Sequence, residues 1–346
     1  MEIRIIGIDL GKTVFHLVGV NARGEVVARK KCSRTQLLRF TSNLPSCLIG
    51  MEACAGSHFL GRALREQGHD ARLMPAQYVK PYVKTNKNDF IDAEACSEAV
   101  TRPTMRFVPI KSDEQLDLQS LHRVRERWVV RRTAVINQIR GMLLERGITM
   151  RKGRHHIEEL LPGILEDPDN NLSGALRVLL RELRHEMQYL HGQIGECDKL
   201  IVRIAGELED CEHLLTVPGI GPTIATATIA AIGNGAAFKK ARGFSAWLGV
   251  VPGERSTGGK QKLIGTSRCG NKYLRKLFLQ GAHAVLQCRT KQDPVLSAWL
   301  ERLVARKRIQ VVAVALANKM ARMAWAILSK GEAYRPPLTA AQTAAA

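Results

Sequence analysis

The chain has 346 residues, of which 52 are Lys or Arg and 32 are Asp or Glu, so its formal charge is +20 at pH 7. Hydrophobic residues make up 45% of the sequence, which excludes a disordered basic tail and indicates a globular chain of about two domains. An excess of positive charge favours a polyanionic partner, because phosphate neutralisation releases counterions. Nucleic acid is the first expectation and an anionic membrane surface the second.

Two features weaken the membrane alternative. The sequence after Met1 has no basic region followed by an apolar core, so no secretory signal is expected. The most apolar late stretch, 309–328, contains Asn318, Lys319 and Arg322, whose burial in lipid is costly, so a core helix is predicted. The eight cysteines are scattered without a C-x-x-C pair, which predicts buried reduced thiols in a cytoplasmic protein rather than disulfides or a zinc site.

The first hundred residues alternate between strand and helix signals. Strands are predicted at 3–9, 14–20 and 25–29, followed by a helix at 34–42, a strand at 47–52, a helix at 57–67 and a strand at 71–74. The turn at 21–24 favours an antiparallel meander of the first three strands. A meander followed by strand-helix alternation predicts an α/β domain with a mixed sheet of the RNase H type.

Four acidic residues of this region occupy positions that suit metal binding. Asp9 and Glu52 end the first and fourth strands, which makes them neighbours if those strands pair. Asp89 and Asp92 lie three residues apart on a predicted helix and so share one face. Any one of these acids alone is more typical of a helix cap or a surface charge. Converging carboxylates bind Mg²⁺, and two such ions can clamp a phosphodiester, so the set predicts a magnesium site.

Residues 7–13, GIDLGKT, allow a competing interpretation. A Walker loop needs four residues between its glycines, and here there are three. The segment is also similar to the first phosphate loop of the actin, hexokinase and heat-shock chaperone ATPases. Their second phosphate loop and their adenosine-binding motif are not found in this sequence, so an ATPase is the minor alternative.

From about residue 113 the chain becomes helical and strongly basic. The density of arginines favours a phosphate-contacting surface that includes Arg123, Arg127 and Arg131; a solvated helix face is the alternative. The acidic, turn-rich stretch 166–171 is a predicted linker.

A heptad pattern follows this linker. Apolar residues recur every seven positions at Leu180, Met187, Ile194, Ile201 and Leu208. This spacing predicts a coiled coil, either between chains or as a hairpin. An amphipathic helix packed within the chain is the alternative, since three interspersed glycines lower the helix propensity.

The part after residue 211 is rich in small residues and is predicted to be mainly helical. Its segment VPGIGP, 217–222, looks like a helix-hairpin-helix motif, in which Gly219 and Gly221 let the backbone approach DNA phosphates. The alternative is a tight turn between two helices of a hydrophobic core.

Ser256 lies in a glycine-rich loop with many cations. Arg255, Lys260 and Arg268 flank it, and Lys272 follows. A hydroxyl in such surroundings can attack a phosphate, because the cations stabilise the charge that develops on the phosphate oxygens. From composition alone, most serines of this kind are turn residues.

Taken together, these motifs resemble the DEDD transposases of the IS110 family, and within it the IS1111 group; the family also includes the Piv-type DNA invertases. The resemblance rests on GIDLGK (7–12), MEAC (51–54), KNDFIDA (87–93), VPGIG (217–221), and GVVP followed by STGGK (249–260). It spans nearly the whole chain.

The resemblance implies a RuvC-like N-terminal domain in which Asp9, Glu52, Asp89 and Asp92 bind Mg²⁺. It also implies a C-terminal transposase domain whose serine forms a covalent phosphoserine with cleaved DNA. Counting from Pro252 places that residue at Thr257, and counting back from Gly270 places it at Ser256; the residue type selects Ser256.

The resemblance further implies an element-encoded bridge RNA that pairs with donor and target DNA, and homodimers or homotetramers in which the acids of one subunit act with the serine of another. Aromatic residues make up 5% of the chain, too few for broad base-stacking surfaces, which agrees with base pairing by an RNA supplying the sequence recognition. The alternatives are a structure-selective RuvC-like nuclease that uses metal-activated water, a Piv-like invertase without an RNA guide, and a non-enzymatic nucleic-acid-binding protein.

The expected organisation has four parts. They are a RuvC-like DEDD domain with a basic helical extension (1–155), a linker and coiled coil (156–210), a transposase domain with the serine (211–335) and a disordered tail (336–346).

Overall fold

The computed structural model describes residues 2–84 and 88–336. They form two compact units, Met1–Asp113 and Glu114–Ala346, each with its own hydrophobic core. The predicted tail, 336–346, lies outside the described residues except for its first position, and Lys87 of the KNDFIDA motif also lies outside them.

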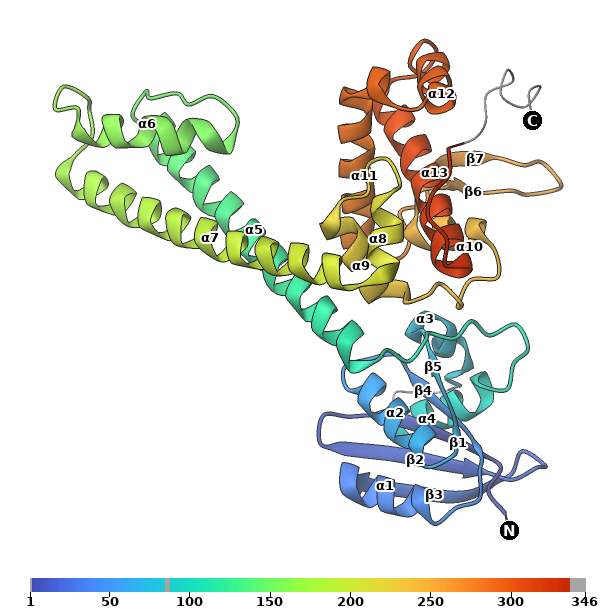
Figure 1. The fold of residues 1–346 in the computed structure, drawn as a ribbon. Helices are drawn as coiled ribbons and strands as arrows, with labels where there is room; N and C mark the ends of the chain where they lie inside the picture. The colour runs from blue at the N-terminus through green and yellow to red at the C-terminus, as the bar shows by residue number, and fades with distance from the viewer. Residues whose placement is uncertain (1, 85–87, 337–346) are drawn as a thin grey trace, which may run out of the picture. The chain divides into compact units, whose positions relative to one another are not determined.

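The first unit is built on a five-stranded sheet (Figure 1). Its strands are β1 (Ile5–Leu10), β2 (Val14–Val20), β3 (Val26–Ser33), β4 (Leu48–Glu52) and β5 (Asp70–Met74), in the order β3-β2-β1-β4-β5. β1, β2 and β3 pair antiparallel, whereas β4 pairs parallel with both β1 and β5. The predicted mixed sheet is confirmed, and its strand order is compatible with the RNase H type.

Helices pack on both faces of this sheet. They are α1 (Arg34–Ser42), α2 (Ser57–Glu66), the short α3 (Ala76–Val79) with the 3₁₀ turn η1 (Lys80–Tyr82), and α4 (Asp89–Ala99). Leu37 of α1 and Leu60 of α2 belong to the same core as Ile8 and Met51. Because side chains alternate along a strand, the neighbouring residues of β1 and β4 face the opposite side, where α4 lies.

Two glycines allow α4 to lie very close to the sheet. Gly7 of β1 and Gly50 of β4 are directly paired. A Cβ added at Gly7 would lie 1.9 Å from the carbonyl oxygen of Ala93, and one at Gly50 would lie 2.8 Å from that of Cys96. The two glycines therefore allow the short distance between α4 and the strands β1 and β4. This distance fixes the position of the acidic first turn of α4.

Replacing Gly7 with alanine is expected to lower the free energy of unfolding by about 2–3 kcal/mol, because the added methyl group meets helix backbone rather than a side chain that can turn away. Urea denaturation followed by circular dichroism measures this change. Gly192→Ala is the control: Gly192 is exposed on a helix with nothing near its Cβ position, so a gain of up to about 1 kcal/mol is expected. An unchanged midpoint for Gly7→Ala would contradict the role of Gly7.

The second unit is mainly helical, with one small hairpin (Figure 1). Its elements are α5 (Asp113–Leu144), α6 (Arg154–Glu166), α7 (Gly174–Glu207), α8 (Glu209–Leu215), α9 (Pro222–Ile232), α10 (Ala241–Leu248), β6 (Pro252–Glu254), β7 (Leu263–Thr266), α11 (Lys272–Gln287), η2 (Arg289–Lys291), α12 (Pro294–Val304) and α13 (Ile309–Lys330).

α5 and α7 run antiparallel to each other. Arg131 of α5 pairs with Glu186 of α7 at 2.7 Å, and Arg125 pairs with Asp198 at 2.6 Å. The buried heptad residue Leu180 shares a cluster with apolar residues of α5 and α6. Part of the predicted seam is thus covered within the chain, and pairing of this seam with a second chain stays a prediction.

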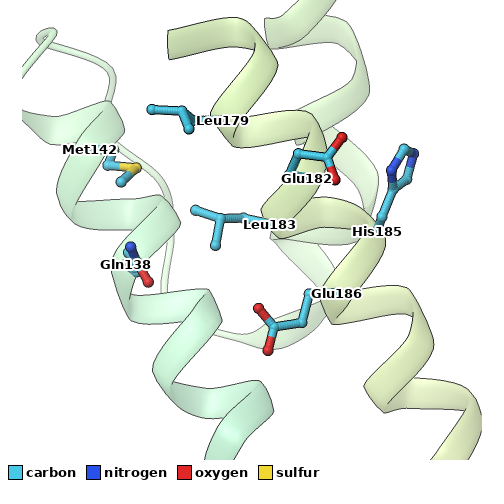
Figure 2. A pocket seen from close by; sticks show the side chains of 7 residues that line it. All are labelled: Gln138, Met142, Leu179, Glu182, Leu183, His185 and Glu186. Atoms are coloured by element: carbon cyan, nitrogen blue, oxygen red, sulfur yellow. The ribbon is translucent and has the colours of Figure 1, made fainter. Parts of the chain in front are cut away.

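A pocket of about 390 Å³ opens between α5 and α7 (Figure 2). Gln138 and Met142 of α5 line one side, and Leu179, Glu182, Leu183, His185 and Glu186 of α7 line the other. Two of its polar groups are carboxylates, which repel phosphate. The pocket therefore does not suit a nucleic-acid backbone.

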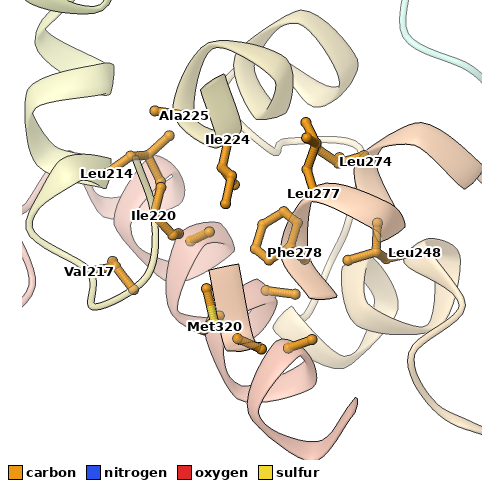
Figure 3. Packing of buried hydrophobic residues seen from close by; sticks show 14 of the residues in the cluster. Leu214, Val217, Ile220, Ile224, Ala225, Leu248, Leu274, Leu277, Phe278 and Met320 are labelled. Carbon is orange, nitrogen blue, oxygen red and sulfur yellow. The ribbon is translucent and has the colours of Figure 1, made fainter. Parts of the chain in front are cut away.

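The helical core of the second unit surrounds α13. Figure 3 shows Met320 of α13 beside Phe278 of α11 and Ile220 of the turn before α9. Among the described helices, α13 alone is long and apolar enough to cross a membrane, by length and composition. Its buried face belongs to this core, as predicted for a core helix.

The cysteine prediction is partly wrong. All eight thiols are free, in agreement with the prediction, but Cys54, Cys269 and Cys288 are exposed rather than buried. Cys54 and Cys269 lie in loops and Cys288 directly follows α11, which leaves these sulfurs near solvent, and Cys32 and Cys197 are half-buried.

A buried histidine ties three helices of the second unit together. The His122 side chain on α5 makes hydrogen bonds of 3.0 Å to the hydroxyls of Tyr273 on α11 and Thr226 on α9. Burial, and then the charge of Arg125, lower the pKa of His122 to about 4, and burial raises the pKa of Tyr273 to about 12. The neutral imidazole is thus the form that the fold requires.

His122 is therefore expected to make stability fall as the solution becomes acidic. The unfolded chain binds a proton below pH 6.5 or so, whereas folded His122 stays neutral down to about pH 4, so lowering the pH from 7 to 4.5 costs about 2–3 kcal/mol. Urea midpoints at both pH values measure the effect. His122→Gln keeps hydrogen-bonding groups without the titration, and equal pH dependence of this variant and the parent protein would contradict the assignment.

Candidate active site

The four predicted acids lie on the α4 face of the sheet, at the carboxyl ends of β1 and β4 and in the first turn of α4. Ile8 pairs with Met51, so Asp9 and Glu52 stand at the next step of the parallel β1 and β4 ladder, on the face of Gly7 and Gly50. Asp89 is the first residue of α4, and Asp92 is in its first turn. The side chain of Asn88 accepts a hydrogen bond from the backbone N–H of Phe90 and caps this helix.

The carboxylates influence one another electrostatically. Glu52 is half-buried, and its pKa is raised. Burial is the larger cause, and the negative charges of Asp9 and Asp92 add to it. A divalent cation would offset this repulsion, because carboxylate oxygens are the ligands that Mg²⁺ prefers. The donor set therefore fits a divalent metal.

His16 adds a nitrogen donor that the sequence analysis did not predict. One ligand atom each of Asp9, His16 and Asp89 lie within 4.8 Å of one another, and His16 Nδ1 lies 3.4 Å from Asp89 Oδ2. Asp9 and His16 are directly paired across β1 and β2. The short turn between two predicted strands was the available signal, since it places residues 9 and 16 opposite each other.

Ser256 lies in the hairpin of β6 and β7. The mainly helical prediction for this part of the chain is confirmed, but the predicted loop around Ser256 is a hairpin, because Pro252–Glu254 and Leu263–Thr266 pair as antiparallel strands. Thr257 and Lys260 are bridged, and Gly258 and Gly259 between them have positive φ. This turn suits two glycines, and the exposed Ser256 stands just before it.

Glu254 is a second residue that the sequence analysis missed. The Ser256 hydroxyl donates a hydrogen bond to Glu254 Oε1, and both side chains are exposed. Alternation along a strand would have placed the residues 254 and 256 on one side of the chain. A carboxylate is thus in reach of the hydroxyl proton.

The predicted cations near the serine are solvent-exposed. Arg255 and Lys260 belong to the hairpin, Arg268 to the segment after β7, and Lys272 begins α11. Arg268 has φ of 53°, a left-handed conformation that costs energy for a side chain with a Cβ. These positions give the hairpin region a positive potential that suits a phosphate.

The arginines of α5 fall into two groups. Arg123, Arg127 and Arg131 are exposed and four residues apart, so they share one face, although Arg131 also pairs with Glu186. Arg125 instead pairs with Asp198 of α7 and is partly buried, which gives it a structural role. The basic run is therefore a mixture of free surface and packing contacts.

The two predicted glycines differ in surroundings. Gly219 has φ of 84°, and a Cβ there would lie 2.9 Å from the carbonyl oxygen of Gly281 on α11, so this turn is packed against the core. Gly221 is the N-cap of α9 and has open space at its Cβ position. Gly221 and Pro222 are half-buried, whereas Ile224 and Ala225 are buried, so the motif reaches the surface only at its Gly221 end.

Among the described residues, two groups of side chains could take part in a reaction. The acids and His16 gather in the first unit, and Ser256, Glu254 and the cations gather in the second. Carboxylates that hold divalent metal, and a hydroxyl beside a base and cations, are both suited to phosphodiester chemistry.

Two protein-family models match the chain. A transposase model of the IS110 DEDD type covers residues 6–147, and the model of the transposase IS116/IS110/IS902 family covers residues 211–295. The first match contains all four acids, and the second contains the β6 and β7 hairpin with Ser256.

Similar proteins extend over almost the whole chain. The chain is 45% identical over 338 residues to a probable family 20 transposase of Pseudomonas aeruginosa, covering 97% of this chain and 100% of that protein. It is 40% identical to the transposase for insertion sequence element IS1328 of Yersinia enterocolitica, covering 96% and 99%. It is 38% identical to the transposase for insertion sequence element IS1111A of Coxiella burnetii, covering 96% and 92%. With both family matches, this likeness shows that the chain belongs to the IS110/IS116 family of insertion-sequence transposases, enzymes that cleave and rejoin DNA.

Proposed function

We propose that this transposase cleaves and rejoins DNA through a covalent bond to Ser256, with Mg²⁺ held by Asp9, Glu52, Asp89 and Asp92. The observation that carries the proposal is the Ser256 hydroxyl hydrogen-bonded to the carboxylate of Glu254 in a cationic hairpin. Two observations support the metal-dependent part: ligand atoms of Asp9 and Asp89 lie within 4.8 Å of each other, and the charges of Asp9 and Asp92 raise the pKa of Glu52.

The four acids hold the divalent metal and orient it. Divalent metal, when bound, supplies positive charge that stabilises phosphodiester oxygens during strand transfer. Asp9 and Glu52 are fixed by paired strands, and Asp89 and Asp92 by a helix that lies directly on them. Rigid supports keep the carboxylates together despite their repulsion, and keep the metal-binding geometry in place between reaction cycles.

The serine acts as the nucleophile. The Ser256 oxygen forms a bond to phosphorus while its proton passes to Glu254, and one ester P–O bond of the DNA strand breaks. The deoxyribose oxygen that leaves takes up a proton from water. Arg255 and Lys260 stabilise the charge on the phosphate oxygens, and the phosphoserine conserves the bond energy for rejoining.

Nucleic acid binds the exposed cationic surfaces. We place double-stranded DNA against Arg268, Lys272 and the first turn of α9 at Gly221, and assign Arg123 and Arg127 to further phosphate contacts. We further propose a bridge RNA as the guide, homodimers or homotetramers as the active assembly, and the bacterial cytoplasm, at the nucleoid, as the location. The +20 charge with few aromatic residues supports recognition through backbones and base pairing.

The RNA guide has a direct test. Purified protein is combined with donor and target DNA, with and without RNA transcribed from the non-coding DNA beside the gene, and recombinant junctions are counted by sequencing. Junctions should form only in the reactions that contain the RNA. Changing an RNA loop should move the junctions to the DNA target that is complementary to the new loop. Equal yields without RNA would favour the invertase-like alternative.

A further inference from the structure

We propose that His16 is a nitrogen ligand of the divalent-metal site, and that it makes the site prefer Mn²⁺ to Mg²⁺. The inference rests on the proposed metal site and adds a fifth residue that changes its metal preference.

His16 interrupts an apolar series. Side chains at alternate positions of β2 face α4, and after His16 these are Val18 and Val20, both buried. His16 is itself buried, with 8% of its surface exposed. An imidazole in this row is costly unless its nitrogens have polar partners, so its presence calls for a reason.

The partners are metal-binding groups. Strand pairing sets His16 opposite Asp9, and its Nδ1 lies 3.4 Å from Asp89 Oδ2. The three ligand atoms lie within 4.8 Å of one another. Two donors bound to one octahedral ion at about 2.1 Å are roughly 3 to 4 Å apart, so a small inward movement of these side chains accommodates a single ion.

The imidazole is already oriented. The ring of Phe90 meets the ring of His16 edge to face, with centroids 4.8 Å apart. Phe90 follows Asp89 in α4, so the helix that carries one oxygen donor also holds the nitrogen donor in place. Packing that fixes the orientation of a ring keeps a ligand nitrogen in position for a metal.

The donor chemistry sets the metal preference. Carboxylates suit both Mg²⁺ and Mn²⁺, but Mg²⁺ takes oxygen ligands and keeps much of its water, whereas Mn²⁺, as a first-row transition metal, also accepts an imidazole nitrogen. Glu52 and Asp92, which act electrostatically together with Asp9, offer oxygen alone. One nitrogen among these carboxylates therefore raises the affinity for Mn²⁺ more than the affinity for Mg²⁺.

Metal binding by the full-length protein tests this without an activity measurement. Titration calorimetry gives the Mn²⁺ and Mg²⁺ affinities of the parent protein and of His16→Gln. Pulsed electron paramagnetic resonance of bound Mn²⁺ detects a ligating nitrogen, and ¹⁵N-labelled histidine identifies it without any substitution. His69→Gln is the control, because His69 is a buried histidine of the same unit that bonds Thr41 and Cys47 instead.

The expected result is a histidine nitrogen signal in the parent protein and in His69→Gln. His16→Gln should lose it, with Mn²⁺ affinity falling by about 10-fold or more and Mg²⁺ affinity by less than about 3-fold. Mn²⁺ bound without a nitrogen signal would overturn the ligand role of His16, and equal losses for both metals would overturn the metal preference; either result leaves the carboxylate site standing. No binding of either metal by the parent protein would overturn the proposed metal site itself.

Discussion

Replacing Ser256 with alanine is expected to abolish covalent protein–DNA adducts and to reduce recombination by about 1000-fold or more, because the attacking oxygen is removed. Binding of nucleic acid should persist, since the cations of the hairpin are unchanged. Adducts are measured on denaturing gels with labelled DNA, and binding by fluorescence anisotropy. Full recombination by Ser256→Ala would show that another group is the nucleophile.

Two neighbouring variants sharpen this experiment. Thr257→Ala removes the adjacent hydroxyl and should leave adducts unchanged, whereas loss of adducts in this variant alone would make Thr257 the nucleophile. Glu254→Gln keeps the shape of the side chain but cannot take the Ser256 proton, so adduct formation should slow by about 100-fold. Cleavage without adducts in Ser256→Ala would favour the nuclease that uses metal-activated water.

Replacing Asp9 with asparagine is expected to reduce DNA cleavage by about 1000-fold and to weaken Mg²⁺ binding, because Asp9 is the acid common to both groups of metal-site residues. Cleavage of labelled DNA and calorimetric titration with Mg²⁺ measure the two losses. Asp70→Asn is the matched control in the same sheet, since Asp70 pairs with Arg72 on the surface and should be dispensable.

Mixing the two variants tests cooperation between subunits. If the acids of one subunit act with Ser256 of another, mixed assemblies of Asp9→Asn and Ser256→Ala should recover recombination that neither variant has alone. Absence of recovery in assemblies shown to contain both chains would contradict that arrangement. Undiminished function of Asp9→Asn alone would favour the non-enzymatic alternative.

Local patterns predicted most of the first unit. The strands β2 and β4 and the helices α1 and α2 were expected within one or two residues of their observed bounds, because alternation and capping are properties of neighbouring residues. The positions of Asp9 and Glu52 at strand ends followed from the same reasoning. The hairpin of β6 and β7 was missed because its strands are short, largely exposed and without regular alternation.

The sequence alone was enough to predict the family, the mixed sheet and the identity of the four acids, because each of these can be recognised from short continuous stretches of residues. Tertiary structure decided which groups meet. Strand pairing and helix packing bring His16 next to Asp89. Arg125 pairs with Asp198 of α7, whereas Arg123 is exposed. Residues distant in sequence become neighbours only when hydrophobic burial folds the chain back on itself, and that step chooses among charges that look equivalent along the sequence.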